Sequence, residues 1–196
     1  MKYLKVFEDF NTTDIKGINE LITKLKEYKL PVDMWGTGEA KTVENLLDEL
    51  NNKECTIIDE GGCLVRHVEF VGVDVFYKDD KGYTYILKED KQVFKDSRVR
   101  RRSMASSVSE KMKSGEDPLK SAIRGVEEEL DIKVSDLTHL KDFSKDSGSQ
   151  SYPGLRSKYD GHKFSCFINK QQFKPNGYIE VQKDKSTFFI WQKLEQ

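Results

Sequence analysis

Apolar residues recur at helical spacing twice within the first sixty residues of the chain. The first set is Ile15, Ile18, Ile22 and Leu25, and the second is Val43, Leu46, Leu47 and Leu50. Side chains three and four positions apart lie on one face of a helix, so each set predicts an amphipathic helix. Pro31 separates the two helices. Together with one strand, they make up a predicted α/β N-terminal extension, residues 1–60.

From Leu64 onward the pattern becomes that of strands. Residues 64–77 are rich in Val and Phe, and residues 83–87 alternate across two faces. The polar turn at 78–82 predicts a hairpin between them. Two more β-rich stretches follow late in the chain, at residues 164–168 and 188–191. Because one helical segment lies between the early and the late strands, we expect an α+β or α/β sandwich in residues 61–196.

The central helix has two distinct faces. Asp117 is a suitable N-cap, and Pro118 suits the first helical position. At about 100° per residue, the apolar side chains gather on one side and the acidic ones on another. The apolar side carries Leu119, Ala122, Ile123, Val126 and Leu130, and the other side carries Gly125, Glu128 and Glu129.

Acidic residues at the C-terminal end of a helix repel one another and oppose the helix dipole. Arg124 lies four residues before Glu128 and can pair with it. A hard divalent cation, Mg²⁺ or Mn²⁺, would compensate the remaining carboxylates, because such ions bind carboxylate oxygens and bridge to substrate phosphates. A solvated acidic face without metal is the alternative, since runs of charge are common.

The overall charge excludes some classes of partner. Lys and Arg number 33 against 34 Asp and Glu, a formal net charge of −1, so no general attraction holds this protein on nucleic acid or on an anionic membrane. Any anion site must therefore be local. No apolar run approaches the roughly 18 residues of a membrane span. Met1–Val6 lacks the apolar region of a signal peptide, so we expect a cytoplasmic protein.

Cysteines and histidines show no metal or disulfide pattern along the sequence. No two cysteines form a C-x-x-C pair, and the histidines are far apart. We therefore expect neither a disulfide framework nor a zinc site. The residues are Cys55, Cys63, Cys166, His67, His139 and His162.

The residues in and before the central helix resemble the Nudix hydrolase box, G-x5-E-x7-R-E-U-x-E-E-x-G-U, where U is aliphatic. The matching positions are Glu116, Arg124, Val126, Glu128, Glu129 and Ile132. Three positions depart from the pattern. Glu110 stands at the first Gly, Gly125 replaces the Glu after Arg, and Asp131 replaces the last Gly. The resemblance implies a Nudix-like α/β/α sandwich with a mixed β-sheet.

The resemblance also implies roles for the matching residues. Glu128, Glu129 and Glu116 would bind Mg²⁺ or Mn²⁺, and Arg124 would orient their carboxylates, which makes Glu128, Glu129 and Arg124 the candidate catalytic residues. A backbone carbonyl near Ser109 would contribute as well.

The missing carboxylate at Gly125 must be supplied from elsewhere if the site is complete. Glu127 lies about 200° around the helix from position 125 and points away. Three acids from later strands or loops remain as candidates, and the sequence does not rank them. They are Asp146, Asp160 and Glu180.

A cluster of arginines precedes the box. Arginine binds phosphate oxygens through two hydrogen bonds, so the cluster is a candidate substrate site, while a soluble edge strand is the alternative. In an extended chain Arg98, Arg100 and Arg102 share one face and Arg101 takes the other. Tyr152 is a second substrate candidate, as a stacking partner for a base or simply as a side chain packed on Pro153.

The resemblance implies hydrolysis of a phosphoanhydride bond in a nucleoside diphosphate linked to X, with a nucleotide or diphosphate as the small-molecule partner. One alternative is a protein that keeps the fold and binds a nucleotide or a protein without hydrolysis. Another is isomerisation of a diphosphate, which would require Cys63 or Cys166 in the pocket. The extension 1–60 would be a lid, a specificity element or the contact of a homodimer.

Overall fold

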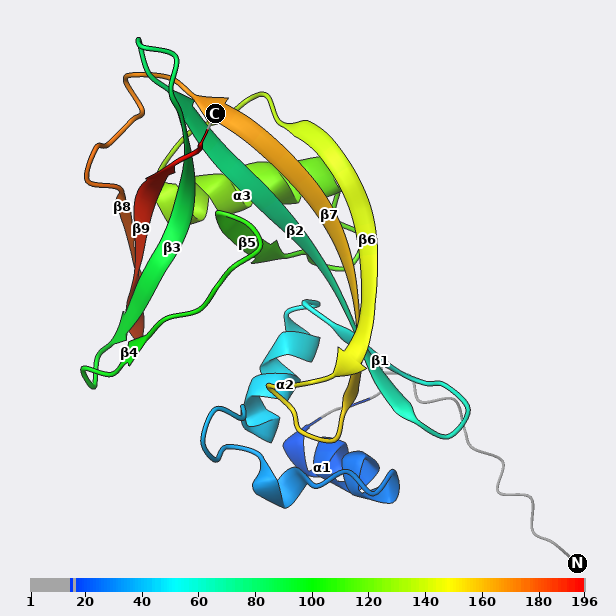
Figure 1. The fold of residues 1–196 in the computed structure, drawn as a ribbon. Helices are drawn as coiled ribbons and strands as arrows, with labels where there is room; N and C mark the ends of the chain where they lie inside the picture. Colours follow the sequence, from blue (N-terminus) through cyan, green and yellow to red (C-terminus); the bar gives the residue numbers. More distant parts are fainter. Residues whose placement is uncertain (1–14, 16, 196) are drawn as a thin grey trace, which may run out of the picture. The chain divides into compact units, whose positions relative to one another are not determined.

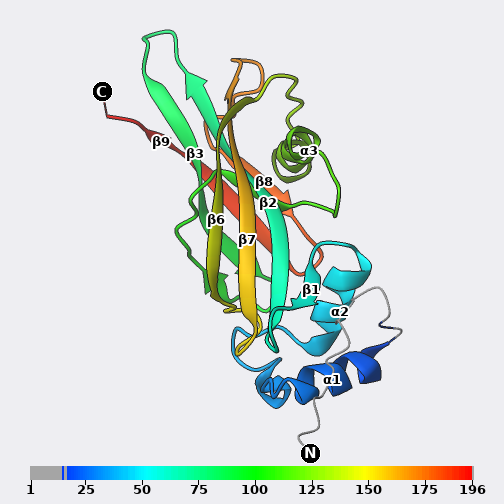
Figure 2. The ribbon, with the colours of Figure 1, turned by 90° about the vertical axis from the view of Figure 1, so that its right-hand side faces the viewer.

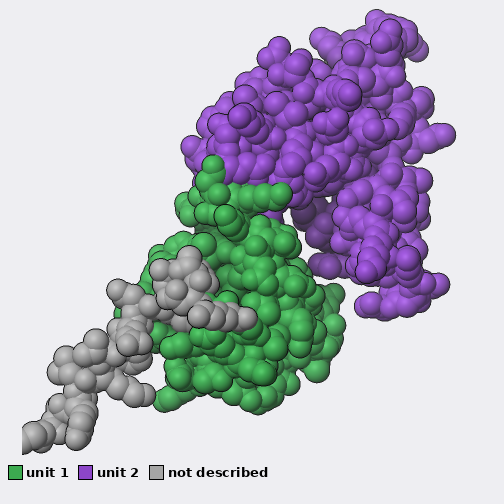
Figure 3. Space-filling model, turned by 180° about the vertical axis from the view of Figure 1, so that it is seen from behind, with its two compact units in different colours: residues 1–69, 112–115, 144–160 green, residues 70–111, 116–143, 161–196 purple. Residues whose placement is uncertain are grey.

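The structure is a computed structural model that describes residue 15 and residues 17–195. The segment Met1–Val6 considered above lies outside these residues. By their contacts the residues form two compact units (Figure 3). Unit 1 comprises Met1–Glu69, Met112–Gly115 and Ser144–Asp160, and unit 2 comprises Phe70–Lys111, Glu116–Phe143 and Gly161–Gln196. No helix in the described part of the chain has the length and apolar character needed to cross a membrane.

Unit 1 contains both helices that the apolar periodicity predicts. They are α1 (Ile18–Glu27) and α2 (Val43–Asn51), with the short 3-10 helix η2 (Val32–Met34) between them. Thr42 caps α2, because its hydroxyl accepts from the Asn45 N–H while the Asn45 side chain accepts from the Thr42 N–H. The inner faces meet in a core that includes Leu21, Leu25, Leu46 and Trp35. Unit 1 extends beyond residues 1–60, and the domain boundary at residue 60 stays a prediction.

A sheet of nine strands runs through the described residues, in the order β6-β7-β2-β3-β9-β8, with β1 and β5 pairing with β2 and β4 with β3. The strands are β1 (Thr56–Asp59), β2 (Leu64–Lys78), β3 (Thr84–Phe94), β4 (Val99–Arg100), β5 (Val108–Lys111), β6 (Thr138–Gly148), β7 (Arg156–Ile168), β8 (Tyr178–Val181) and β9 (Lys185–Lys193). Strands β2, β6 and β7 contribute residues to both units.

The sheet is mixed. Strand β2 pairs antiparallel with β3 and β5, and β9 pairs antiparallel with β3 and β8. The neighbours β2 and β7 instead point the same way (Figure 1). The predicted α/β fold with a mixed sheet is therefore confirmed. Helix α3 (Pro118–Leu130) is the only helix in the part of unit 2 that the structure describes, and it lies along one face of the sheet (Figure 2).

The start of α3 follows the predicted signals. The Asp117 carboxylate accepts a hydrogen bond from the Lys120 N–H at 3.0 Å, and Pro118 is the first helical residue. The helix ends where Asp131 adopts a left-handed conformation with φ of 55°.

The buried face of α3 differs from the predicted one. It contains Ser121 and Gly125 in addition to three of the expected apolar residues, Ala122, Val126 and Leu130, whereas Leu119 is 41% exposed. The reason is that α3 packs against β5 and β8, which rotates its contact face toward the side of Gly125.

Candidate active site

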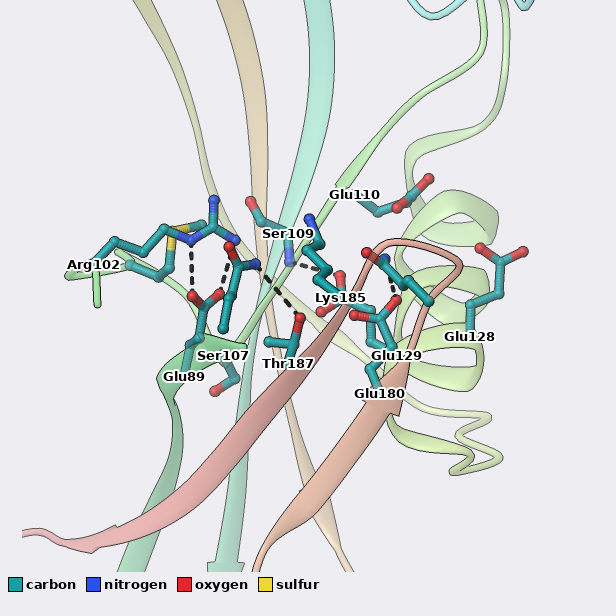
Figure 4. Close-up of a pocket in the computed structure, with 13 residues that line it drawn as sticks. Glu89, Arg102, Ser107, Ser109, Glu110, Glu128, Glu129, Glu180, Lys185 and Thr187 are labelled. Atoms are coloured by element: carbon teal, nitrogen blue, oxygen red, sulfur yellow. Dashed lines mark hydrogen bonds and ion pairs between the residues drawn. The ribbon is translucent and has the colours of Figure 1, made fainter. Parts of the chain in front are cut away.

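A polar pocket of about 220 Å³ lies within unit 2, where α3 meets β3, β5, β8 and β9 (Figure 4). Glutamates from four elements line it, together with two basic side chains. The glutamates are Glu89, Glu110, Glu128, Glu129 and Glu180, and the basic residues are Arg102 and Lys185. The pocket therefore collects more negative than positive charge.

Glu129 is the carboxylate most affected by this crowding. Its Oε1 atom accepts a hydrogen bond of 3.4 Å from the Ser109 N–H. Burial and the neighbouring charge of Glu180 nevertheless raise the pKa of Glu129 to about 8. Glu110 and Glu89 act in the same direction. In the metal-free protein this site therefore binds a proton near neutral pH.

Arg124 lies among several carboxylates in and before the helix. Its Nε and Nη2 atoms each donate to Glu116 at 3.1 Å, and Nη1 donates to Glu110 at 2.8 Å and to Glu128 at 3.3 Å. These carboxylates, Glu116 foremost, raise the pKa of Arg124, so it stays a cation. Glu116 does not line the pocket. Its contact with Arg124 is through two hydrogen bonds, a geometry suited to orienting the guanidinium.

Two departures from the Nudix box meet in space. A Cβ atom built on Gly125 would lie only 2.9 Å from Cβ of Glu110 and 3.4 Å from Cγ1 of Val108. The helix thus approaches β5 so closely that only glycine fits at position 125. The family's Glu is absent at 125, and a Glu stands on β5 where the family has Gly. Glu110 lines the pocket. The sequence shows both departures from the box, at positions 110 and 125. Only the structure shows that these two positions are in contact.

The structure separates the three candidate replacement acids. Glu180 on β8 lines the pocket and accepts a 2.5 Å hydrogen bond from the Gln182 side chain. Asp146 belongs to unit 1, where it pairs with Arg156. Asp160 also belongs to unit 1 and does not line this pocket.

The arginine cluster contributes only Arg102 to the pocket. Arg102 donates two hydrogen bonds of 2.8 Å to Glu89, whose side chain is almost completely buried. Arg98 pairs with Asp96 at 2.7 Å, and Arg100 is exposed; neither lines the pocket. The extended strand β4 ends at residue 100, so the alternation expected through residue 102 does not hold.

Two polar residues on neighbouring strands were not anticipated from the sequence. Lys185 on β9 adds a second positive charge to the pocket. Gln92 on β3 is 2% exposed, and its Nε2 atom donates to Thr187 at 3.5 Å. Its Oε1 atom is buried without a hydrogen-bond partner among the described residues. A buried acceptor that is left unpaired costs free energy. No local sequence motif identifies either residue.

Tyr152 lies in the core of unit 1. It is fully buried, its ring lies 5.1 Å from that of Trp35, and the Arg66 guanidinium lies 5.3 Å from its ring centre. No face of the ring is open to a base. Neither Cys166 nor Cys63 lines the pocket. Cys166 is buried, and burial raises the pKa of its thiol to about 11.

No family model matches this chain, and no curated protein sequence matches it significantly. Solved Nudix structures are similar to it. A MutT/nudix family protein from Enterococcus faecalis is 13% identical with a TM-score of 0.46, over 89% of this chain and 56% of that protein. The Ap4A hydrolase of C. elegans in a binary complex is 15% identical with a TM-score of 0.37, over 65% of this chain and 80% of the hydrolase.

The NUDIX domain of NrtR from Shewanella oneidensis, crystallised with ADP ribose, is 9% identical with a TM-score of 0.40, over 65% of this chain and 73% of that domain. At such identities the likeness concerns the fold alone. The chemistry of the pocket depends on which residues this chain places there.

The contact between α3 and β5 predicts a coupled effect of two substitutions. Gly125→Ala should lower the free energy of unfolding by about 1–3 kcal/mol, because the new methyl group meets Glu110, although alanine favours a helix elsewhere. Glu110→Gly removes the blocking Cβ, so the double variant should recover at least about 1 kcal/mol of that loss in a double-mutant cycle. Urea unfolding of the wild type, the two single variants and the double variant measures these free energies. Strictly additive effects would contradict the close approach.

The raised pKa of Glu129 predicts a pH-dependent stability in the presence of a chelator. The carboxyl pKa rises from 4.5 to about 8 on folding, so the native state binds a proton that the unfolded state has lost. Wild-type stability should therefore fall between pH 5 and pH 9. Glu129→Gln cannot ionise and should gain up to roughly 4 kcal/mol relative to wild type over that range.

Thermal or urea unfolding across this pH range gives the comparison. Glu127→Gln, at an exposed position of the same helix, serves as the control and should follow the wild-type profile. If the stabilities of wild type and Glu129→Gln changed with pH in the same way, the pKa of Glu129 would not be raised.

Proposed function

We propose that this pocket binds Mg²⁺ or Mn²⁺ and catalyses hydrolysis of a phosphoanhydride bond in a nucleoside diphosphate linked to X. The observation that carries the proposal is the convergence of five glutamates with Arg102 and Lys185 on one pocket. Carboxylate oxygens suit a hard divalent cation, and basic side chains suit the phosphate groups that such a cation bridges.

The residues present fit a divalent cation. Burial and the repulsion from Glu180 together raise the pKa of Glu129, and an ion with two positive charges would relieve that repulsion. Glu128 is 58% exposed and remains accessible at the pocket edge. We assign Glu128, Glu129 and Glu180 as ligands, with Glu110 as the carboxylate that replaces the one missing at Gly125. A bound cation would polarise the diphosphate and lower the pKa of a coordinated water.

The other side chains of the pocket would position the substrate and the ligands. Arg124 fixes Glu110 and Glu128 through the hydrogen bonds described above. Glu116 is predicted from the family resemblance as a metal ligand, and we now assign it to orienting Arg124, because it contacts the guanidinium and does not line the pocket. Arg102 is held in place by Glu89.

The phosphate groups would lie between the metal ligands and the two basic residues. Arg102 and Lys185 would stabilise the charge that develops on the phosphate oxygens during cleavage. The unpaired Oε1 atom of Gln92 would accept a hydrogen bond from a substrate hydroxyl or an ordered water.

Hydrolysis should appear when the protein is screened with Mg²⁺ or Mn²⁺ against nucleoside diphosphate sugars, dinucleoside polyphosphates and nucleoside triphosphates. Glu128→Gln and Glu129→Gln should each lower kcat by about 100-fold or more, because loss of a metal ligand exceeds the 10- to 100-fold effect of its supporting residues. Glu127→Gln is the matched control. Full activity in both ligand variants, or no hydrolysis with any substrate, would refute the proposed reaction.

The exchange at Gly125 favours one other function, binding of a diphosphate without hydrolysis. The same screen separates the two, because a binding protein would show metal-dependent affinity for the substrates in calorimetry and release no product.

The choice of Glu180 over Asp146 is tested by metal affinity. Glu180→Gln should weaken Mn²⁺ binding by at least about 10-fold, because it removes a pocket carboxylate. Asp146→Asn should leave the affinity within about two-fold, since Asp146 pairs with Arg156 in unit 1. Calorimetric titration of the two variants and the wild type with Mn²⁺ measures these affinities. The reverse order of effects would contradict the assignment of Glu180 as a metal ligand.

A further inference from the structure

A second group of side chains of metal-ligating types lies in unit 2, outside the pocket. His139 and Asp142 come from β6, and His162 comes from its neighbour β7. The His139 Nε2 atom lies 2.8 Å from Asp142 Oδ1, and the His162 Nδ1 atom lies 2.7 Å from the same oxygen. Their separation along the sequence led us to expect no zinc site. Pairing of the two strands brings the histidines together all the same.

We propose that His139, Asp142 and His162 form a binding site for a first-row transition metal ion, of which Zn²⁺ is the best match. Two imidazole nitrogens and one carboxylate oxygen are a donor set that Zn²⁺ accepts, with a fourth position left for water. Imidazole favours such ions over Mg²⁺, so this site differs in chemistry from the all-oxygen pocket.

The geometry allows an ion to enter with small side-chain movements. The three candidate ligand atoms all lie within 4.8 Å of one another. Ligands on one Zn²⁺ ion, at about 2.0–2.2 Å each, can be separated by at most about 4 Å. The side chains of His139 and Asp142 are half exposed or more, so rotation can close that difference.

One ligand is already oriented by its surroundings. The His139 ring lies edge-on to Phe164, with ring centres 5.3 Å apart. Asp142 Oδ1 lies within hydrogen-bond distance of both imidazoles, so the three side chains already converge on one point. The histidines must be neutral, with the ligating nitrogens deprotonated, for a metal ion to replace these hydrogen bonds.

The consequence of binding would be local stabilisation of β6. This strand is the outermost in the sheet order, and nearly all of its residues are exposed. A metal ion bound by residues of both β6 and β7 would hold this exposed strand to its neighbour. A ligand that binds only the native state stabilises the native state.

The test uses the full chain, freed of metal, in the Cys63→Ser background so that the exposed thiol cannot contribute. Zn²⁺ is titrated by calorimetry in excess Mg²⁺, which competes for the glutamate pocket. We expect one site per chain. His139→Gln and His162→Gln should each weaken binding by at least 10-fold, and Zn²⁺ should raise the Tm of the parent but not of the double variant.

Two matched controls locate the ion. His67→Gln removes a histidine of unit 1 that pairs with Glu60 at 3.3 Å, and Glu129→Gln alters the pocket. Both should bind Zn²⁺ as the parent does. Unchanged binding in the His139 and His162 variants, or loss of binding in either control, would overturn the proposal. Circular dichroism of each variant tests whether the substitution leaves the fold intact.

Discussion

The close approach of α3 to β5 at Gly125 and Glu110 is the contact on which the candidate active site depends. A helix with any side chain at position 125 would have to move away from the strand, because its Cβ would meet that of Glu110 at 2.9 Å. The contact sets the rotation of the helix. It thereby turns Glu129 toward the Ser109 N–H and Arg124 toward Glu110. The same helix–strand contact therefore fixes both the packing at Gly125 and the positions of the charged side chains Glu129 and Arg124.

The pocket holds more carboxylates than basic side chains. Arg124 and Arg102 each pair with specific carboxylates, whereas burial and the nearby charge of Glu180 displace the pKa of Glu129 upward. A carboxyl whose ionised form is disfavoured in this way is characteristic of functional sites. An ion with two positive charges would favour that ionised form, so the crowding of carboxylates would favour binding of a cation.

The molecule carries two donor sets that differ in kind. The pocket offers carboxylate oxygens next to basic side chains, which suits a hard cation shared with phosphate. The β6–β7 group offers imidazole nitrogens with one carboxylate and has no phosphate-binding side chain among its ligands. Imidazole nitrogens favour Zn²⁺ over Mg²⁺, so the two donor sets differ in the cation that each favours.

The sequence by itself determined the local features. The apolar periodicity predicted α1 and α2, Asp117 and Pro118 marked the start of α3, and the box spacing placed the adjacent glutamates on one helical face. These follow from interactions over a few residues. Only the tertiary structure decided that Glu110 faces Gly125, that Glu180 enters the pocket, and that the distant histidines meet. The physical reason is that sheet pairing and helix packing join residues far apart in the chain, and no local pattern encodes those distances.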